Sequence, residues 1–84
     1  MKNKMLIEIF LPASGRTFEF RIPRSYHIFQ VNEMLVRFFS EHSDGAYVPD
    51  EKSVLCDRKT GRILNGALCV DQLERMGNPR LMLI

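Results

Sequence analysis

The chain has 84 residues, of which 45% are hydrophobic and 26% charged, and its formal net charge is +2. This length suits one domain, 1–84, with a small core, and the composition excludes an intrinsically disordered chain. The basic residues are scattered along the chain rather than gathered in runs. Strong electrostatic binding to nucleic acid or anionic lipid is therefore not expected.

The sequence also argues against a targeting segment and a metal site. No stretch approaches the ~20 apolar residues that a membrane span needs, and Glu8 interrupts the apolar stretch after the basic N-terminus, so we expect neither a membrane span nor a signal peptide. Cys56 and Cys69 have no CxxC spacing and do not complete a zinc pattern with the two histidines. We expect a cytoplasmic protein without a metal or cofactor.

The first two elements form a predicted hairpin. In residues 5–11 the apolar side chains at 5, 7, 9 and 11 share one face of a strand. The turn at 13–16 contains Gly15, which can take a positive φ. Residues 17–22 then alternate strictly, with Phe18, Phe20 and Ile22 on the inner face.

A helix is predicted from 28 to 42. Ile28, Val31, Leu35 and Phe38 recur at helical spacing, and residues 34 and 39 widen this apolar stripe. Ser25 precedes the helix as a candidate cap, and a glycine at 45 is a plausible stop.

The remaining elements are shorter. We predict a strand at 53–57, a tight basic turn at 58–62, a very short strand at 63–64, a helical turn at 70–76 and a final strand at 80–84. The predicted fold is α+β: a mixed four- to five-stranded sheet with one long helix packed on one face.

The order and spacing of these elements resemble ubiquitin and the β-grasp fold. The turn and strand at 15–22, the helix stripe, the segment 64–73 and the last strand each have a counterpart in ubiquitin. Within that superfamily the chain is most similar to the bacterial YukD/EsaB group, through residues 54–57, the basic turn and residues 64–66. Those proteins are associated with type VII secretion systems, and the resemblance implies a cytoplasmic accessory role.

Conjugating members of this superfamily act through a flexible C-terminal tail that ends in two glycines. This sequence ends on a predicted strand at Ile84, so we expect a protein that does not conjugate. No nucleophile with a nearby base and no glycine-rich phosphate loop is visible, so we also expect no enzymatic activity.

Function is instead expected on the sheet face that the helix leaves uncovered, since ubiquitin-like proteins bind most partners there. The side chains predicted on this face are unusually apolar, and such a patch usually marks an interface. The third strand contributes either Leu55 or Cys56, because its register is open; we assign the former. The predicted protein-binding patch is Leu6, Phe10, Leu55, Met82 and Ile84.

Two alternatives remain. The same patch could join two copies of the chain in a homodimer. The second alternative is a nucleic-acid-binding β-grasp domain that uses the turn at 58–62, although no aromatic side chain interleaves these basic residues to stack bases. The residues of this alternative site are Arg16, Arg58, Lys59 and Arg62.

Overall fold

The computed structural model describes residues 3–42, 45, 53–75 and 79–84. Within these ranges the chain forms the strands β1 (Lys4–Leu11), β2 (Arg16–Pro23), β3 (Leu55–Asp57) and β4 (Arg80–Leu83), and the helices α1 (Ile28–His42) and α2 (Val70–Arg75). The strands form one sheet in the order β2-β1-β4-β3. The β1–β4 pair is parallel, and the β1–β2 and β3–β4 pairs are antiparallel.

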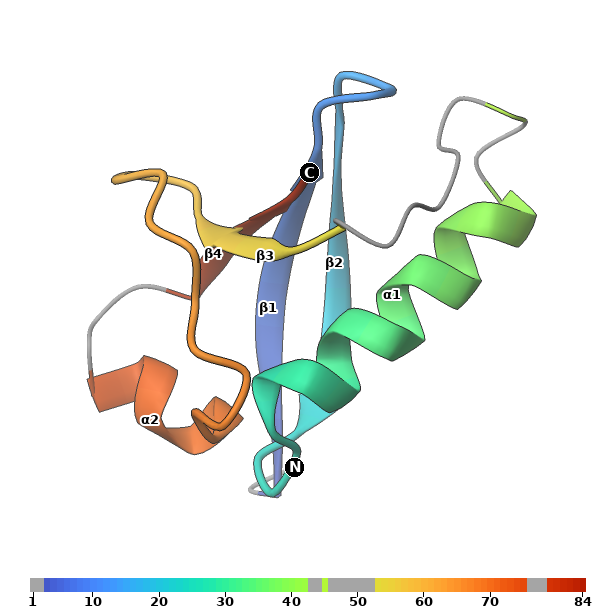
Figure 1. Ribbon diagram of the computed structural model, residues 1–84. Coiled ribbons are helices and arrows are strands. Elements are labelled where there is room, and N and C mark those ends of the chain that lie inside the picture. Colours follow the sequence, from blue (N-terminus) through green and yellow to red (C-terminus); the bar gives the residue numbers. More distant parts are fainter. Residues whose placement is uncertain (1–2, 43–44, 46–52, 76–78) are drawn as a thin grey trace.

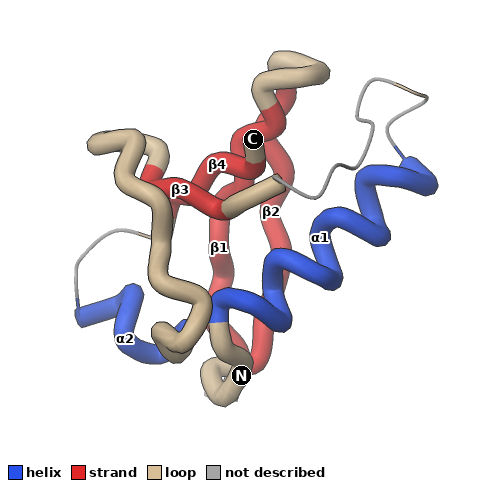
Figure 2. Tube along the Cα trace, in the orientation of Figure 1, coloured by secondary structure: helices blue, strands red, loops and turns tan. Residues whose placement is uncertain are grey.

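The long helix α1 lies diagonally across one face of this sheet (Figure 1). A loop after β3 leads down beside the sheet to the short helix α2 (tan and blue in Figure 2). The arrangement confirms the predicted α+β fold, with a mixed four-stranded sheet and one long helix packed on one face.

The hairpin follows the alternation of the sequence. Ile7, Ile9 and Leu11 of β1 are fully buried on the α1 side, as their spacing predicts. Gly15 has a φ of 69° in the turn and donates its backbone N–H to the carbonyl of Leu11 at 2.9 Å. The positive φ explains why the tight turn contains a glycine.

The apolar stripe of α1 differs in one position from the prediction. Phe39, not Phe38, continues the buried line of the helix. Its ring packs 5.0 Å from Phe18 and 5.9 Å from Phe20. The ring of Phe38 is half-buried and meets Phe20 edge-on at 5.2 Å, and within the helix it stacks on His42 at 4.5 Å. Because α1 crosses the sheet obliquely, its last turns present position 39 to the sheet and position 38 to its margin.

The cap of α1 is also not the predicted one. His27, rather than Ser25, occupies the cap position, and its backbone N–H donates to the side-chain oxygen of Gln30 at 2.8 Å. At the other end, His42 Nδ1 lies 2.9 Å from the carbonyl oxygen of Phe38. His42 thus contacts the last turn of α1 through a ring nitrogen.

The two helices begin side by side and satisfy each other's first backbone donors. The N–H of Ile28 donates to the carbonyl of Leu68, and the N–H of Val70 donates to the carbonyl of Tyr26, both at 2.8 Å. The first N–H groups of a helix have no partner within it. This reciprocal pair therefore anchors the start of α1 and the segment that precedes α2 against each other.

The predicted short strand at 63–64 is reduced to a single bridge. Ile63 pairs with Cys56 alone, between two flanking backbone hydrogen bonds. The strand predicted at 53–57 is also shorter in the structure, where β3 covers only residues 55–57. Val54 nevertheless exchanges two backbone hydrogen bonds with Ile84, which extends the β3–β4 pairing by one residue.

Candidate functional site

The open face of the sheet, which we define as the side opposite α1, carries a row of apolar side chains. Residues opposite each other in neighbouring strands share a face. Phe10 is opposite Met82, Met82 is opposite Cys56, and Cys56 is opposite Ile63. These four residues therefore form one row that crosses β1, β4 and β3.

A second apolar row lies beside the first. Ile84 follows Met82 by two residues, and its backbone pairs with that of Val54, so both side chains point to the open face. Ile84 is 52% exposed and Ile63 is 68% exposed. We call the two rows together, without the buried Cys56, the apolar patch; it consists of Phe10, Val54, Ile63, Met82 and Ile84.

A charged row borders this patch on one side. It contains Glu8, Glu19, Arg58 and Arg80, since Glu8 is opposite both Glu19 and Arg80. Glu8 forms ion pairs at 3.5 Å with Arg58 and with Arg80. These side chains are partly exposed, so the pairs contribute little to stability and chiefly set the polar border of the patch.

Leu6 is exposed on the open face, as predicted, but it does not join the patch. Its side chain is 53% exposed and lies opposite Arg21. Glu8 separates it from Phe10 along β1, so the charged row lies between the two. The structure thus brings together Phe10, Met82 and Ile84 and leaves Leu6 apart.

Leu55 does not belong to the exposed surface, which corrects the predicted patch. It is opposite Leu83, on the α1 side of the sheet, and is 2% exposed. The register of β3 instead turns Cys56 to the open face, where it is fully buried. Burial raises the pKa of the Cys56 thiol, because desolvation penalises the thiolate.

Arg58 covers part of the patch. Its guanidinium carbon lies 4.4 Å from the centre of the Phe10 ring, and its Nη1 lies 3.4 Å from the hydroxyl oxygen of Thr17. A guanidinium over an aromatic ring is attracted by the ring's quadrupole. Arg58 therefore links the charged row to the apolar patch and leaves the ring of Phe10 only half-exposed.

The four basic residues of the alternative site do not form one cluster. Arg16 is opposite the buried Leu11, which places it on the α1 side, and its guanidinium carbon lies 5.3 Å from the centre of the Phe18 ring. Arg58 is on the open face, in contact with Glu8. The sheet therefore separates these two side chains.

Lys59 and Arg62 stay exposed in the turn after β3. Asp57 organises this turn, because its carboxylate accepts the hydroxyl of Thr60 at 2.7 Å and the backbone N–H groups of Lys59 and Thr60. The Thr60 hydroxyl, chiefly, lowers the pKa of the Asp57 carboxyl.

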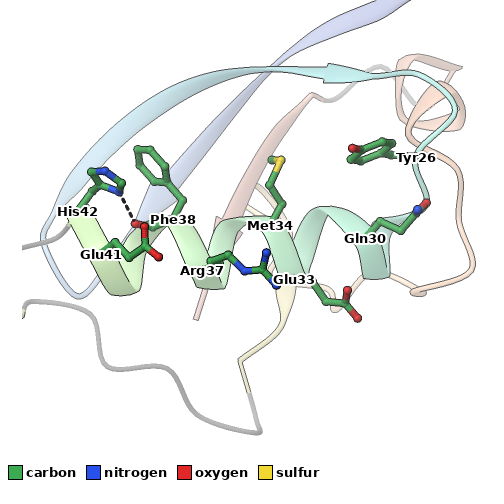
Figure 3. A pocket seen from close by; sticks show the side chains of 8 residues that line it. All are labelled: Tyr26, Gln30, Glu33, Met34, Arg37, Phe38, Glu41 and His42. Carbon is green, nitrogen blue, oxygen red and sulfur yellow. Dashed lines mark hydrogen bonds between the residues drawn. The ribbon is translucent and has the colours of Figure 1, made fainter.

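A groove that sequence reasoning missed runs along α1. It has a volume of about 490 Å³ and opens to solvent. Tyr26, Met34 and Phe38 lie between the helix and the neighbouring strand β2, while Glu33, Arg37 and Glu41 point away from that strand (Figure 3). In the sequence, this groove corresponds to the apolar positions of α1 that lie next to its charged positions.

Ile63 and Val54 are the two residues of the apolar patch that the predicted site lacks. In the sequence Ile63 belongs to a short apolar pair, 63–64, and the two faces of such a pair cannot be distinguished from sequence. Its bridge to Cys56 assigns Ile63 to the open face, while the half-buried Leu64 takes the opposite orientation.

The described part of the chain contains no group of three or more His, Cys, Asp or Glu side chains arranged to hold a metal ion. None of the helices within the same ranges has the length and hydropathy of a membrane span.

Known structures share this arrangement. A designed protein based on ubiquitin aligns over 100% of this chain and 90% of its own, with a TM-score of 0.66 and 20% sequence identity. The N-terminal ubiquitin-like domain in the 4931431F19Rik protein aligns over 98% of this chain and 74% of its own, with a TM-score of 0.68 and 13% identity. The fold is therefore ubiquitin-like.

A third similar structure is a chain of the MycP5-free ESX-5 inner membrane complex. It aligns over 98% of this chain but only 21% of its own length, with a TM-score of 0.73 and 12% identity. No family model and no curated protein matches the sequence. At these identities the similarities establish the fold alone.

Proposed function

We propose that this chain is a protein-interaction domain that binds its partner through the apolar patch on the open face. The observation that carries the proposal is the contiguity of the patch: exposed apolar side chains from β1, β4 and the bridge at Ile63 lie in adjacent rows. A contiguous apolar patch with a polar border is the usual anatomy of a protein interface. The fold alone would not support this function, because one fold serves many.

The charged row gives the interface an orientation. Glu8, Arg58 and Arg80 lie along one side of the patch only, while Ile84 and Val54 lie on its other side. A partner with an apolar centre and charged groups along one border fits this surface in one direction. Such charges influence specificity and association rate more than affinity.

The proposed setting is that of a cytoplasmic accessory of a type VII secretion system. Two observations support it: the sequence resemblance to the YukD/EsaB group, and the structural similarity to a chain of the ESX-5 inner membrane complex. Neither establishes the partner. The expectation that the chain does not catalyse a reaction accompanies this proposal as a prediction.

The patch is tested by comparing two substitutions of equally exposed apolar residues. Ile84 is 52% exposed within the patch, and Phe29 is 51% exposed on α1. Partners captured by cross-linking in cells and identified by mass spectrometry should be lost with Ile84→Asp and retained with Phe29→Asp. A buried charge without a partner costs several kcal/mol in an interface, so we expect a loss of about 100-fold or more.

The same experiment can refute the proposal. If Ile84→Asp and Ile63→Asp both capture the wild-type set of partners, the apolar patch is not the interface. If capture depends on the patch but the partners are unrelated to a secretion complex, only the proposed setting fails.

Nucleic-acid binding is not proposed as a second function. Arg16 and Arg58 lie on opposite faces of the sheet, and Arg58 is held by Glu8 and Phe10. No observation in the described residues favours this alternative.

A further inference from the structure

The strand β2 is an edge of the sheet formed by the described residues. It has eight residues, and within the described ranges β1 is its only partner strand, so its outer side has none. The opposite edge is different, because Ile63 and its two flanking backbone hydrogen bonds cover β3. An edge strand offers a row of backbone donors and acceptors to another strand.

The residues that face outward can be identified from the hydrogen-bond pattern. In an antiparallel pair, alternate residues direct both backbone groups toward the partner strand. The N–H of Arg24 donates to the carbonyl of Asn3 at 2.9 Å, so every second residue before Arg24 faces β1. Thr17, Glu19 and Arg21 therefore direct their N–H and C=O groups away from the sheet.

The side chains of these same residues carry complementary charges. Glu19 and Arg21 are exposed on the open face, two residues apart, and neither forms an ion pair within the described ranges. In an antiparallel pairing of two β2 strands, the alignment that places Glu19 opposite Arg21 makes two attractive pairs by symmetry. Alignments that place Glu19 opposite itself, or Arg21 opposite itself, bring like charges together and are disfavoured.

The favoured alignment also suits the α1 side of the strand. It places Phe20 opposite its own counterpart, and cross-strand aromatic pairs stabilise a sheet. Phe20 is half-buried, and its ring meets the ring of Phe38 at 5.2 Å, at the margin of the groove along α1. Met34 and Tyr26 of that groove would flank the added strand (Figure 3).

We propose that a second copy of this chain pairs with β2 in the antiparallel sense, so that the two mixed sheets join into one continuous eight-stranded sheet. The contact is self-complementary, as a two-fold interface requires. Glu19 and Arg21 of each copy select the register, and their outward N–H and C=O groups exchange the hydrogen bonds across the new junction. The proposal is independent of the proposed function, because the open face of each copy stays uncovered.

The test is a charge-reversal series followed by sedimentation over a range of concentrations. Wild type should dimerise, and Glu19→Arg or Arg21→Glu alone should weaken the dimer about tenfold or more, since each turns two attractions into two repulsions. The double variant Glu19→Arg/Arg21→Glu should restore most of the affinity. Arg75→Glu makes the same change of charge on an exposed site of α2 and should have no effect.

Amide hydrogen exchange gives a second measurement that requires no substitution. At high concentration the amides of Glu19 and Arg21 should exchange more slowly than at low concentration, while those of Phe18 and Phe20 should not change. The proposal is overturned if the protein sediments as a monomer at protein concentrations up to about 1 mM. The free energy of association would then be weaker than about −4 kcal/mol. It is also overturned if the double variant does not recover, or if Ile84→Asp alone disrupts the dimer.

Discussion

The two faces of the sheet are built from the same strands but differ in what covers them. On the α1 side, Ile7, Ile9 and Leu81 are at most 1% exposed. On the open face the alternate residues Glu8, Phe10 and Met82 are all partly exposed. The comparison indicates that the α1 side supplies most of the stability, while the open face keeps apolar side chains exposed to solvent.

The largest effect should come from the covered face. Ile9→Ala removes buried methylene groups and leaves a cavity under α1, so we expect a loss of about 2–5 kcal/mol of unfolding free energy. Ile84→Ala on the open face should cost less than about 1 kcal/mol, because the side chain is already 52% exposed. Urea denaturation of both variants measures the difference, and equal losses would contradict the division between the faces.

The next largest loss of stability is expected at Cys56, whose side chain points to the open face but is covered by its neighbours. Cys56→Ser places a hydroxyl where the side chain is 0% exposed, and we expect a cost of about 1–3 kcal/mol. Cys69→Ser is the control: its thiol donates to the carbonyl of Arg24 at 3.0 Å, a bond that a serine can keep. Thermal unfolding measures both.

The thiol itself provides a check that needs no variant. Since burial raises the pKa of Cys56, alkylation of the native protein at neutral pH should label Cys69 first, as shown by peptide mass spectrometry. Faster labelling of Cys56 would contradict its burial.

Arg58 should have a smaller effect on stability. Arg58→Ala removes the cation from the Phe10 ring and one ion pair of Glu8, and together these should cost about 0.5–1 kcal/mol. Arg58→Lys keeps the charge but loses the planar contact, so it should recover only part of that loss. A loss above about 2 kcal/mol in chemical denaturation would show that Arg58 is structural rather than a border of the patch.

The smallest effect concerns acid stability. The pKa of Asp57 is lowered from 3.8 in the folded state, chiefly by the Thr60 hydroxyl. Such a group stabilises the fold above its unfolded pKa and loses that contribution as the pH falls through the folded value. Below about pH 4 the unfolding free energy of wild type should decline, and that of Asp57→Asn should depend less on pH. Acid unfolding curves measure this, and identical curves for the two proteins would count against the role of Asp57.

Most of the fold could be predicted from the sequence because its periodicities are clear. The helix at 28–42 matches α1, the turn at 70–76 contains α2, and the alternation at 17–22 lies within β2. The errors fall where local signals are short. Residue 63 forms a bridge rather than a strand, and the cap of α1 depends on a hydrogen bond from His27 to Gln30 that residue type alone does not specify.

The candidate site was less predictable than the fold. Phe10 and Met82 follow from strand alternation, but the choice between Leu55 and Cys56 depends on the pairing of β3 with β4. A shift of one residue in a strand exchanges its two faces, and a three-residue strand has too little periodicity to fix the choice. The position of Arg58 over Phe10 is likewise a long-range contact.

The sequence by itself determined the order of elements and the face of each long element that is buried, because spacings of two and of about 3.6 residues encode these locally. Only the tertiary structure decided which residues of different strands stand together. It set the register that buries Leu55, brought Ile63 beside Cys56 and, within the described residues, left the outer side of β2 without a partner strand. Those outcomes depend on pairings between segments far apart in the chain, which no local pattern records.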